Sequence, residues 1–369
     1  MTEGISTAEV SAWLLRHIEG VTAPFTFELI TGGHSNLTFA VTDAAGRRLV
    51  LRRPPMSHVL ATAHDMGREH RIISALRDTP VPVPAALGYC ADEAVNGRPF
   101  YVMDFVDGYI LRGAAETKAV LDEGTRKVAG EDLIDVLAAI HRVDVDAVGL
   151  GGLARHDGYI ERQLRRWYGQ FQQSQQQEHQ VGVYRPVPLV EEVHALLADR
   201  VPPQHGTAIV HGDYRLDNTI VSGDGKVRAV LDWELCTLGD PLADVGTLMV
   251  YWADPLDGRS PAPAATLVAA TDPPDGRSPA PAATPVAATA LPGFPSRAEL
   301  AARYAARSGR DLSDLSFYIA FANWKLACIL EGVYVRYAAR AMGAERADAG
   351  AIGPGVEDRA RRALQALQS

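Results

Sequence analysis

The feature that most constrains this sequence is a pair of short acidic segments in its second half. The first runs from His211 to Asn218 and contains Asp213, and the second contains Asp232, nineteen residues after Asp213. Residues 219–231 between them read as a strand, a tight turn and a second strand. Such a hairpin would return Asp232 to the side of Asn218.

These residue types suit phosphoryl transfer, which depends on positioning and on neutralising the charge of the phosphates. Asp213 would act as the catalytic base, and Asn218 and Asp232 would supply oxygen ligands of the kind that Mg²⁺ prefers. The spacing of the His, the Asp and the Asn matches the protein-kinase catalytic loop, although Gly212 stands in place of its arginine. The competing interpretation is that Asp213 begins a turn and Asp232 ends a strand for structural reasons alone.

The two segments, 211–218 and 231–244, resemble the catalytic and metal segments of the aminoglycoside phosphotransferase family. They most resemble the branch that includes the kinase-like domain attached to some acyl-CoA dehydrogenases. The resemblance implies an α+β, bilobal protein-kinase-like fold with a small β-rich N-lobe, a larger and mostly helical C-lobe, and ATP between them. We expect the N-terminal ATP-binding lobe at 1–106 and the C-terminal catalytic and acceptor-binding lobe at 107–369. These motifs specify the fold better than the acceptor, because one fold serves many substrates.

A strand expected at 47–53 should carry the cation that contacts the phosphates. No lysine precedes Lys118, so an arginine must replace the lysine that protein kinases use on their third strand. Alternation with period two places Val50 and Arg52 on one face, which would direct Val50 to adenine and Arg52 to the phosphates. Arg53 is the alternative, and both arginines could instead be solvated at the end of the strand.

Other nucleotide contacts are expected from a helix and a strand that follow. Glu69 lies on a helical segment and would orient Arg52, as the equivalent glutamate does in kinases, although a lone helix glutamate is usually solvated. The apolar run that ends at Asp104 reads as a strand leading into a hinge. By resemblance, Met103 would lie behind adenine, and backbone groups of Asp104 and Val106 would bond its edge.

The turn between the strands expected at 25–31 and 37–42 is rich in glycine and small polar residues. Its glycines would allow the backbone to approach a ligand closely, and similar loops occur in the family. We expect this turn to cover the phosphates of ATP, although a plain hairpin turn is the competing interpretation. The residues concerned are Gly33, His34, Ser35 and Asn36.

Helices are predicted from apolar spacing at 6–18, 132–141, 159–177, 297–307 and 315–340. A capping box from Ser6 to Glu9 would open the first, and the third, rich in Arg and Gln, should be mostly solvated. Residues 254–271 recur almost unchanged as 272–289, and their Pro and Ala content predicts a flexible insertion at about 254–297. A lid over the acceptor site is a second interpretation of this insertion.

Composition argues against several other classes of protein. With 369 residues, 47% hydrophobic residues and 22% charged residues, the chain falls in the range of soluble globular proteins. A net charge of −9 argues against a nucleic-acid binder, which needs a basic face. No segment approaches the roughly 18 apolar residues of a membrane span, and three widely separated cysteines suit a reducing compartment. We therefore expect a cytoplasmic protein without a membrane partner.

The sequence thus predicts an ATP- and Mg²⁺-dependent phosphotransferase that acts on the hydroxyl of a small molecule. The broad family suggests an aminoglycoside-like antibiotic or a related alcohol, and the branch suggests a hydroxyacyl-CoA or similar metabolite. A polycationic aminoglycoside would require acidic groups in the cleft, and a CoA thioester would require basic ones. A non-catalytic nucleotide-binding scaffold is a third interpretation, favoured by the missing third-strand lysine. Arg215 and Glu234 are further candidates for contact with phosphate, metal or acceptor.

Overall fold

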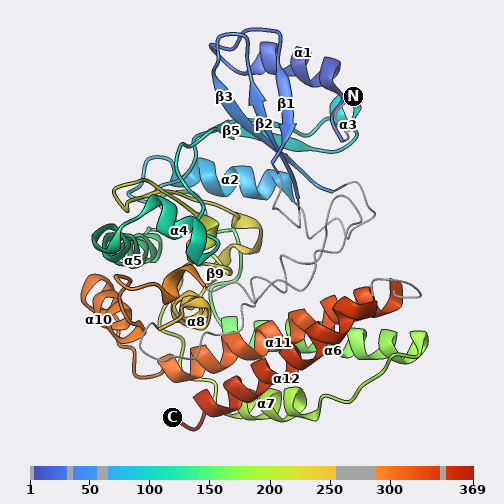
Figure 1. Ribbon diagram of the computed structural model, residues 1–369, viewed down its shortest axis with the longest axis vertical. Coiled ribbons are helices and arrows are strands. Elements are labelled where there is room, and N and C mark those ends of the chain that lie inside the picture. The colour runs from blue at the N-terminus through green and yellow to red at the C-terminus, as the bar shows by residue number, and fades with distance from the viewer. Residues whose placement is uncertain (1–3, 31–35, 56–64, 255–286, 341–345) are drawn as a thin grey trace.

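The computed structural model describes residues 4–30, 36–55, 65–254, 287–340 and 346–369. Three residues of the expected phosphate-covering turn, Gly33, His34 and Ser35, lie outside the described residues, as does most of the tandem repeat at 254–289. The described chain forms two lobes that follow one another in sequence (Figure 1). This two-lobed α+β arrangement confirms the predicted fold class.

The first lobe contains β1 (Thr26–Leu29), β2 (Leu37–Thr42), β3 (Arg48–Arg53), β4 (Ala86–Cys90), β5 (Phe100–Asp104), α1 (Thr7–His17), α2 (Met66–Leu76) and α3 (Glu93–Asn96). Its strands form one antiparallel sheet with the order β1-β2-β3-β5-β4. In Figure 1, α2 lies beneath this sheet, on the side of the second lobe. Both strands that were predicted around the phosphate-covering turn are present as β1 and β2.

Alternation along β3 separates two apolar clusters. Leu49 and Leu51 pack with the buried side chains of α1, whereas Val50 packs in the same cluster as Ile72 and Ile73 of α2. Because successive side chains of a strand point to opposite faces, Arg52 follows Val50 to the α2 side. The sheet therefore directs one arginine of β3 toward the second lobe.

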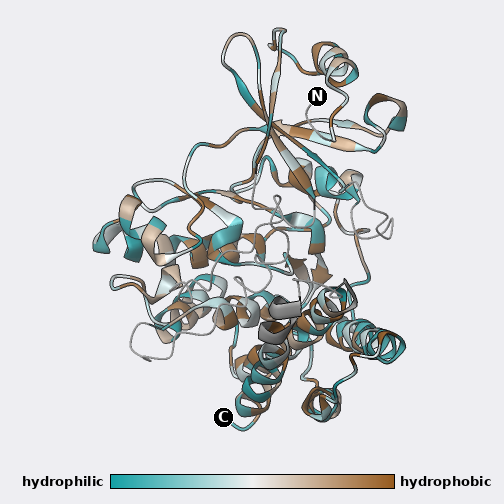
Figure 2. Cartoon of the chain, turned by 45° about the vertical axis from the view of Figure 1, so that its right-hand side comes forward, coloured by the Kyte–Doolittle hydropathy of each residue, from teal (hydrophilic) through white to brown (hydrophobic). Residues whose placement is uncertain are grey.

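The second lobe is mostly helical. Its helices are α4 (Ala114–Val120), α5 (Glu123–Ile140), α6 (Tyr159–Val181), α7 (Pro188–Asp199), α8 (Leu242–Tyr251), α10 (Arg297–Ser308), α11 (Leu315–Arg340) and α12 (Arg346–Ala366). Two small antiparallel pairs carry the acidic segments: β6 (Ala208–Val210) with β9 (Thr237–Gly239), and β7 (Thr219–Val221) with β8 (Val227–Val230). Helix α11 packs against α6, α8 and α12, and in Figure 2 the helices of this lobe carry both hydrophobic (brown) and hydrophilic (teal) residues.

The predicted helices are present, with differences at their ends. Helix α5 begins at Glu123, nine residues before the predicted start, and α12 was not predicted at all. The capping box at Ser6 was wrong, since its side chain makes no capping hydrogen bond and its N–H donates to Asn96 Oδ1 at 2.9 Å. A partner distant in sequence thus replaces the local one.

Helix α6 is less solvated than its composition suggested. Leu164, Trp167 and Phe171 form a buried stripe at helical spacing along the face that meets α11. The Gln and Arg side chains between them obscured this stripe in the sequence. Within the described residues, no helix combines the length and the apolar character that a membrane span requires. All three cysteines are buried and none forms a disulfide.

Candidate active site

The loop at 211–218 connects β6 to β7 and ends in a short 3-10 turn. Its first two N–H groups donate to one buried carboxylate: His211 N lies 2.6 Å from Asp244 Oδ2, and Gly212 N lies 2.8 Å from Asp244 Oδ1. The His211 ring also anchors the second acidic segment, because its Nε2 lies 2.9 Å from the carbonyl oxygen of Leu231. Asp244 therefore braces the loop.

Gly212 departs from the protein-kinase pattern for a local steric reason. Its φ is +87°, a left-handed conformation that favours glycine. A Cβ at this position would lie 2.9 Å from the Cβ of Leu235 and 2.9 Å from its carbonyl oxygen. The arginine of the protein-kinase motif therefore cannot occupy this backbone as it stands.

Asp213 is held by one of its two carboxylate oxygens. Asn218 Nδ2 donates to Asp213 Oδ2 at 2.9 Å and to the Asp213 carbonyl oxygen at 2.8 Å. Arg215 Nε lies 3.3 Å from the same Oδ2, and the Asp213 side chain is 27% exposed. Among the described residues, no hydrogen-bond donor meets Oδ1. One oxygen of this carboxylate is therefore oriented by its neighbours, and the other accepts no hydrogen bond from a described residue.

The hairpin of β7 and β8 brings the second acidic segment beside the first, as predicted. The pairing continues past the strands, because Leu231 N donates to Asn218 O at 2.9 Å. Asp232 then has φ 65° and is the only non-glycine residue in the described part of the chain with positive φ. Such a conformation is unfavourable for a side-chain-bearing residue and persists where its surroundings impose it.

Arg52 joins the two lobes through carboxylates. Its Nη2 lies 2.6 Å from Asp232 Oδ1 and 3.8 Å from Glu234 Oε2, and its Nε lies 3.4 Å from Glu69 Oε2. Burial acts to lower the pKa of Arg52, but the nearby carboxylates outweigh it and raise the pKa above its ordinary value. Burial likewise acts to raise the pKa of Asp232, but Arg52 outweighs it and lowers the pKa. Both side chains therefore stay ionised.

Glu69 is fixed by further polar groups. It is 2% exposed, Tyr101 OH donates to its Oε2 at 3.1 Å, and Asn36 Nδ2 lies 3.4 Å from its Oε1. Asn36 Nδ2 also lies 3.2 Å from Glu234 Oε2. Burial raises the pKa of Glu69, and Arg52 opposes this. Tyr101 was not predicted as part of this cluster. Because Tyr101 and Met103 are two residues apart on β5, strand alternation places both side chains on the same face, and this signal was present in the sequence.

The two arginines at the end of β3 take different directions. Arg53 bonds backbone carbonyls, with its Nε 3.2 Å from Pro54 O and its Nη1 donating to Gly4 O. Arg52 instead meets the carboxylates, and Val50 next to it pairs across the sheet with Met103. Val50 and Met103 are both buried on the α2 side of the sheet. The structure thus places Val50, Arg52 and Met103 on the same face of the sheet.

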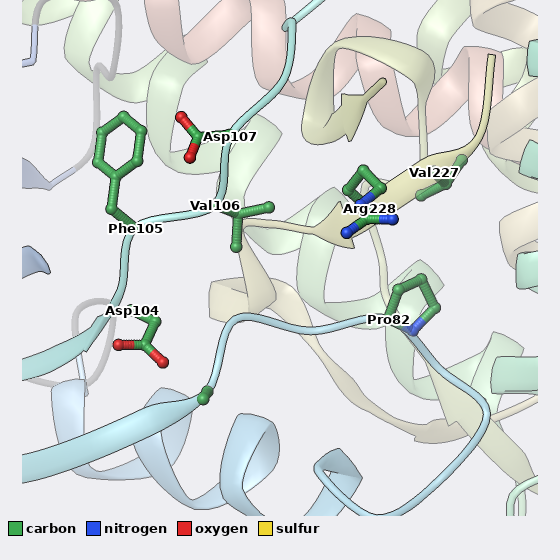
Figure 3. Close-up of a pocket in the computed structure, with 8 residues that line it drawn as sticks. Pro82, Asp104, Phe105, Val106, Asp107, Val227 and Arg228 are labelled. Atoms are coloured by element: carbon green, nitrogen blue, oxygen red, sulfur yellow. The ribbon is translucent and has the colours of Figure 1, made fainter. Parts of the chain in front are cut away.

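The hinge after β5 borders a pocket of about 540 Å³. Figure 3 shows residues 104–107 on one side of it and Pro82, Val227 and Arg228 on the other. Neither Arg52 nor Asp232 lines this pocket, so it is separate from the carboxylate cluster. Among the described residues, no backbone carbonyl accepts a hydrogen bond from the Val106 N–H.

Comparison with known proteins identifies the family and the fold. The chain matches the phosphotransferase enzyme family over residues 26–282. It is 32% identical over 318 residues to acyl-CoA dehydrogenase family member 10 of Mus musculus, covering 85% of this chain and 27% of that protein. It is 31% identical over 313 residues to acyl-CoA dehydrogenase family member 11 of Gallus gallus, covering 83% and 36%. The chain thus spans about a third of the length of these relatives.

Solved structures share the fold over nearly the whole chain. A protein of Ralstonia eutropha JMP134, provisionally described as an aminoglycoside phosphotransferase, is 32% identical, with a TM-score of 0.74 and 98% of both chains covered. Aminoglycoside phosphotransferase APH(4)-Ia, solved with AMP-PNP and hygromycin B, is 15% identical, with a TM-score of 0.56 and coverage of 96% and 98%. The second likeness shows the fold alone. On the family match, the relatives and the shared two-lobed fold, the chain has a kinase-like fold and belongs to the phosphotransferase enzyme family.

Proposed function

We propose that this protein transfers the γ-phosphoryl group of ATP to a hydroxyl of a small molecule, with Mg²⁺. The observation that carries the proposal is the contact of Arg52 with Glu69 in one lobe and Asp232 in the other. Kinases place a strand cation, a helix glutamate and a metal-binding aspartate at the phosphates, so this contact supports a nucleotide site between the lobes. We also propose 1–106 and 107–369 as the limits of the two lobes, because the hinge follows β5.

The oxygen atoms available in the cluster fit Mg²⁺. Asn218 donates its amide nitrogen to Asp213, so its Oδ1 remains for a cation, and Asp232 uses only Oδ1 to bond Arg52. In the described part of the chain, no group of three or more His, Cys, Asp or Glu side chains could hold a metal by itself. Mg²⁺ commonly completes its coordination with phosphate and water. Bound through Asn218 and Asp232, it would neutralise charge on the phosphates.

In this proposal Asp213 acts on the acceptor. Its open Oδ1 accepts a hydrogen bond from the acceptor hydroxyl, while Asn218 and Arg215 hold Oδ2. The hydroxyl oxygen bonds to the γ-phosphorus as the bond to the β-phosphate oxygen breaks, and the hydroxyl proton passes to Asp213. Arg215 places a positive charge beside the reacting groups, which is the role left open for it in the sequence.

The same geometry supports a place for the nucleotide in this proposal. Val50 and Met103 would contact adenine, the backbone of Asp104 and Val106 would bond its edge, and Arg52 would reach the phosphates. Asn36 borders the same cluster through Glu69 and Glu234. Coverage of the phosphates by the turn at 31–35 stays a prediction.

The charges near Asp213 favour an anionic acceptor over a polycationic one. Arg215 lies over the ring of Tyr251, with its Cζ 4.9 Å from the ring centroid. Arg359 is 4% exposed and bonds Asn323 Oδ1 at 3.2 Å, and the charges of Arg215 and Arg359 both act on the hydroxyl of Tyr251. Arg215 pairs with Asp213 and Asp217 at 3.3 and 3.2 Å, so the preference for a hydroxyacyl-CoA or similar anionic metabolite over an aminoglycoside rests on Arg359.

A non-catalytic scaffold is less well supported. The lysine that is missing from the third strand is replaced by Arg52, which is buried and contacts the expected glutamate. The ion pair of Arg52 with Glu69 keeps a cation at the position where kinases have lysine, so the missing lysine does not by itself indicate a loss of activity.

The test of the proposed function is a screen of alcohols with ATP and Mg²⁺, read by mass spectrometry for a gain of about 80 Da, one phosphoryl group. The screen includes hydroxyacyl-CoA esters and aminoglycosides. Asp213→Asn is the matched control, and we expect it to lose about 10²- to 10⁴-fold in kcat while binding ATP as the wild type does. Full transfer by Asp213→Asn would refute the assignment of the base.

A further inference from the structure

Helix α11 carries a lysine in a position where its neighbours are apolar. Lys325 is 9% exposed, and Phe321, Trp324 and Cys328 around it on the helix are buried core residues. Lysine is rarely buried unless its ammonium group has partners. The burial of Lys325 therefore requires specific partners for its ammonium group.

The ammonium group of Lys325 contacts the backbone of the loop at 211–218. Lys325 Nζ donates to the carbonyl oxygen of Gly212 at 2.8 Å and lies 5.3 Å from the ring centroid of Trp167, which favours a cation. Burial lowers the pKa of Lys325, and the negative charges of Asp213 and Asp244 oppose this. Lys325 thus donates a hydrogen bond to the peptide group that immediately precedes the proposed base.

The hydrogen bond from Lys325 leaves Gly212 held at both its N–H and its carbonyl oxygen. The Gly212 N–H is held by Asp244 Oδ1 at 2.8 Å, and its carbonyl oxygen is held by Lys325. Leu235 leaves no room for a side chain at Gly212. The φ of Gly212, +87°, is also a conformation that residues other than glycine rarely adopt. Because glycine has the most conformational freedom of all residues, a loop built on it needs external restraints to hold the following side chain still.

We propose that Lys325 is a positioning residue for the phosphoryl transfer, and that it keeps Asp213 aligned by anchoring the Gly212 carbonyl. The inference rests on the proposed function, in which Asp213 is the base. Lys325 touches neither nucleotide nor acceptor in this role. It acts through the orientation of the Gly212–Asp213 peptide, which a charged donor holds more firmly than a neutral one.

The test compares three variants of the full chain. Lys325→Met keeps the length of the apolar stem and removes the donor, Lys325→Arg keeps a charged donor, and Lys127→Met removes an exposed lysine of α5 as the control. We expect Lys325→Met to lower kcat about 10- to 100-fold with KM for ATP unchanged, which is the effect of a misplaced base. Lys325→Arg should recover most of kcat, and Lys127→Met should match the wild type.

Amide hydrogen exchange gives a readout that needs no activity. In Lys325→Met, we expect the Gly212 and Asp213 amides to exchange at least about 10-fold faster, while amides of β6 keep their rates. Wild-type exchange at both amides, or wild-type kcat in Lys325→Met, would overturn the proposal. If Lys325→Met does not fold, Lys325→Gln replaces it: its shorter, neutral amide lacks the charged donor, so the same fall in kcat and the same faster exchange are expected.

The two proposals fail in different ways. A wild-type protein that phosphorylates no alcohol, combined with faster exchange in Lys325→Met, would remove the proposed function and leave the anchoring of Gly212 supported. Transfer by the wild type with unchanged kcat in Lys325→Met would leave the function in place and remove the role of Lys325.

Discussion

The Arg52 guanidinium lies 2.6 Å from the Asp232 carboxylate, although the two residues are 180 positions apart in the chain. One comes from the sheet of the first lobe and the other from the end of a hairpin in the second. The proposed phosphate-binding cation and the proposed metal ligand therefore neutralise each other directly. ATP and Mg²⁺ would enter by replacing this contact with contacts to phosphate, so nucleotide binding and the relation of the lobes should be coupled.

Replacing Arg52 by Met should reduce both stability and transfer. Glu69 is buried against Arg52, and a buried carboxylate that loses its cation destabilises a protein by about 3–5 kcal/mol. We expect a similar fall in the free energy of unfolding, measured by urea denaturation, and a loss of about 10²- to 10³-fold in kcat/KM for ATP. Arg53→Met, which removes contacts to backbone carbonyls on the other face, is the control. Equal kcat/KM losses in the two variants would contradict the choice of Arg52.

Removal of the metal should stop the reaction reversibly. We expect EDTA to abolish transfer and added Mg²⁺ to restore it. Asp232→Asn should raise the Mg²⁺ concentration for half-maximal activity by at least about 10-fold, because a charged oxygen ligand is lost. Asp224→Asn, in the turn of the same hairpin, serves as the control and should titrate like the wild type. An unchanged Mg²⁺ requirement in Asp232→Asn would exclude this residue as a ligand.

The backbone at Gly212 should tolerate no side chain. Gly212→Ala would bring a Cβ to 2.9 Å from the Leu235 backbone oxygen, so the loop must shift and kcat should fall about 10²-fold. Gly309→Ala is a matched control, since Gly309 also has positive φ, at +70°, but meets no atom within 4 Å. It should cost about 1–2 kcal/mol of stability for the left-handed backbone and leave kcat unchanged. Thermal unfolding and steady-state kinetics separate the two effects.

Stability should fall as pH rises from about 5 to 8 because of one buried carboxyl group. Burial, opposed by Arg185 and aided by Glu178, raises the pKa of Glu331 to about 8. The unfolded chain loses this proton near pH 4.5, so the folded state binds more protons between these values, and its stability decreases through that window. The contribution is fully present below pH 4.5 and lost above pH 8.

The variant Glu331→Gln checks this assignment. It should flatten the pH dependence of the urea midpoint between pH 5 and 8 and be more stable than the wild type at pH 8, by about 1 kcal/mol or more. Glu357→Gln removes a more exposed carboxyl that also contacts Arg185 and is the control. A wild-type slope in Glu331→Gln would assign the pH dependence to another group.

Much of the fold was predictable because it depends on neighbours in sequence. The strand alternation that separates Val50 from Leu49 and Leu51, and the turn that returns Asp232 to Asn218, are local patterns that appear as expected. Helix α6 was judged too polar because its buried stripe is interrupted by Gln and Arg. Helix α12 was missed, and it contains Pro354, which ordinarily opposes a helix interior.

By itself, the sequence determined the chemistry available to this protein: the base and ligand side chains, their spacing, and an arginine where kinases have lysine. Tertiary structure alone decided which of these groups meet. Arg52 was brought to Asp232 from the other lobe, Glu69 was fixed by Tyr101, and Lys325 was brought to Gly212 from a helix 113 positions away. Periodicity encodes the direction of a side chain within its own element, whereas such contacts depend on how separate elements pack.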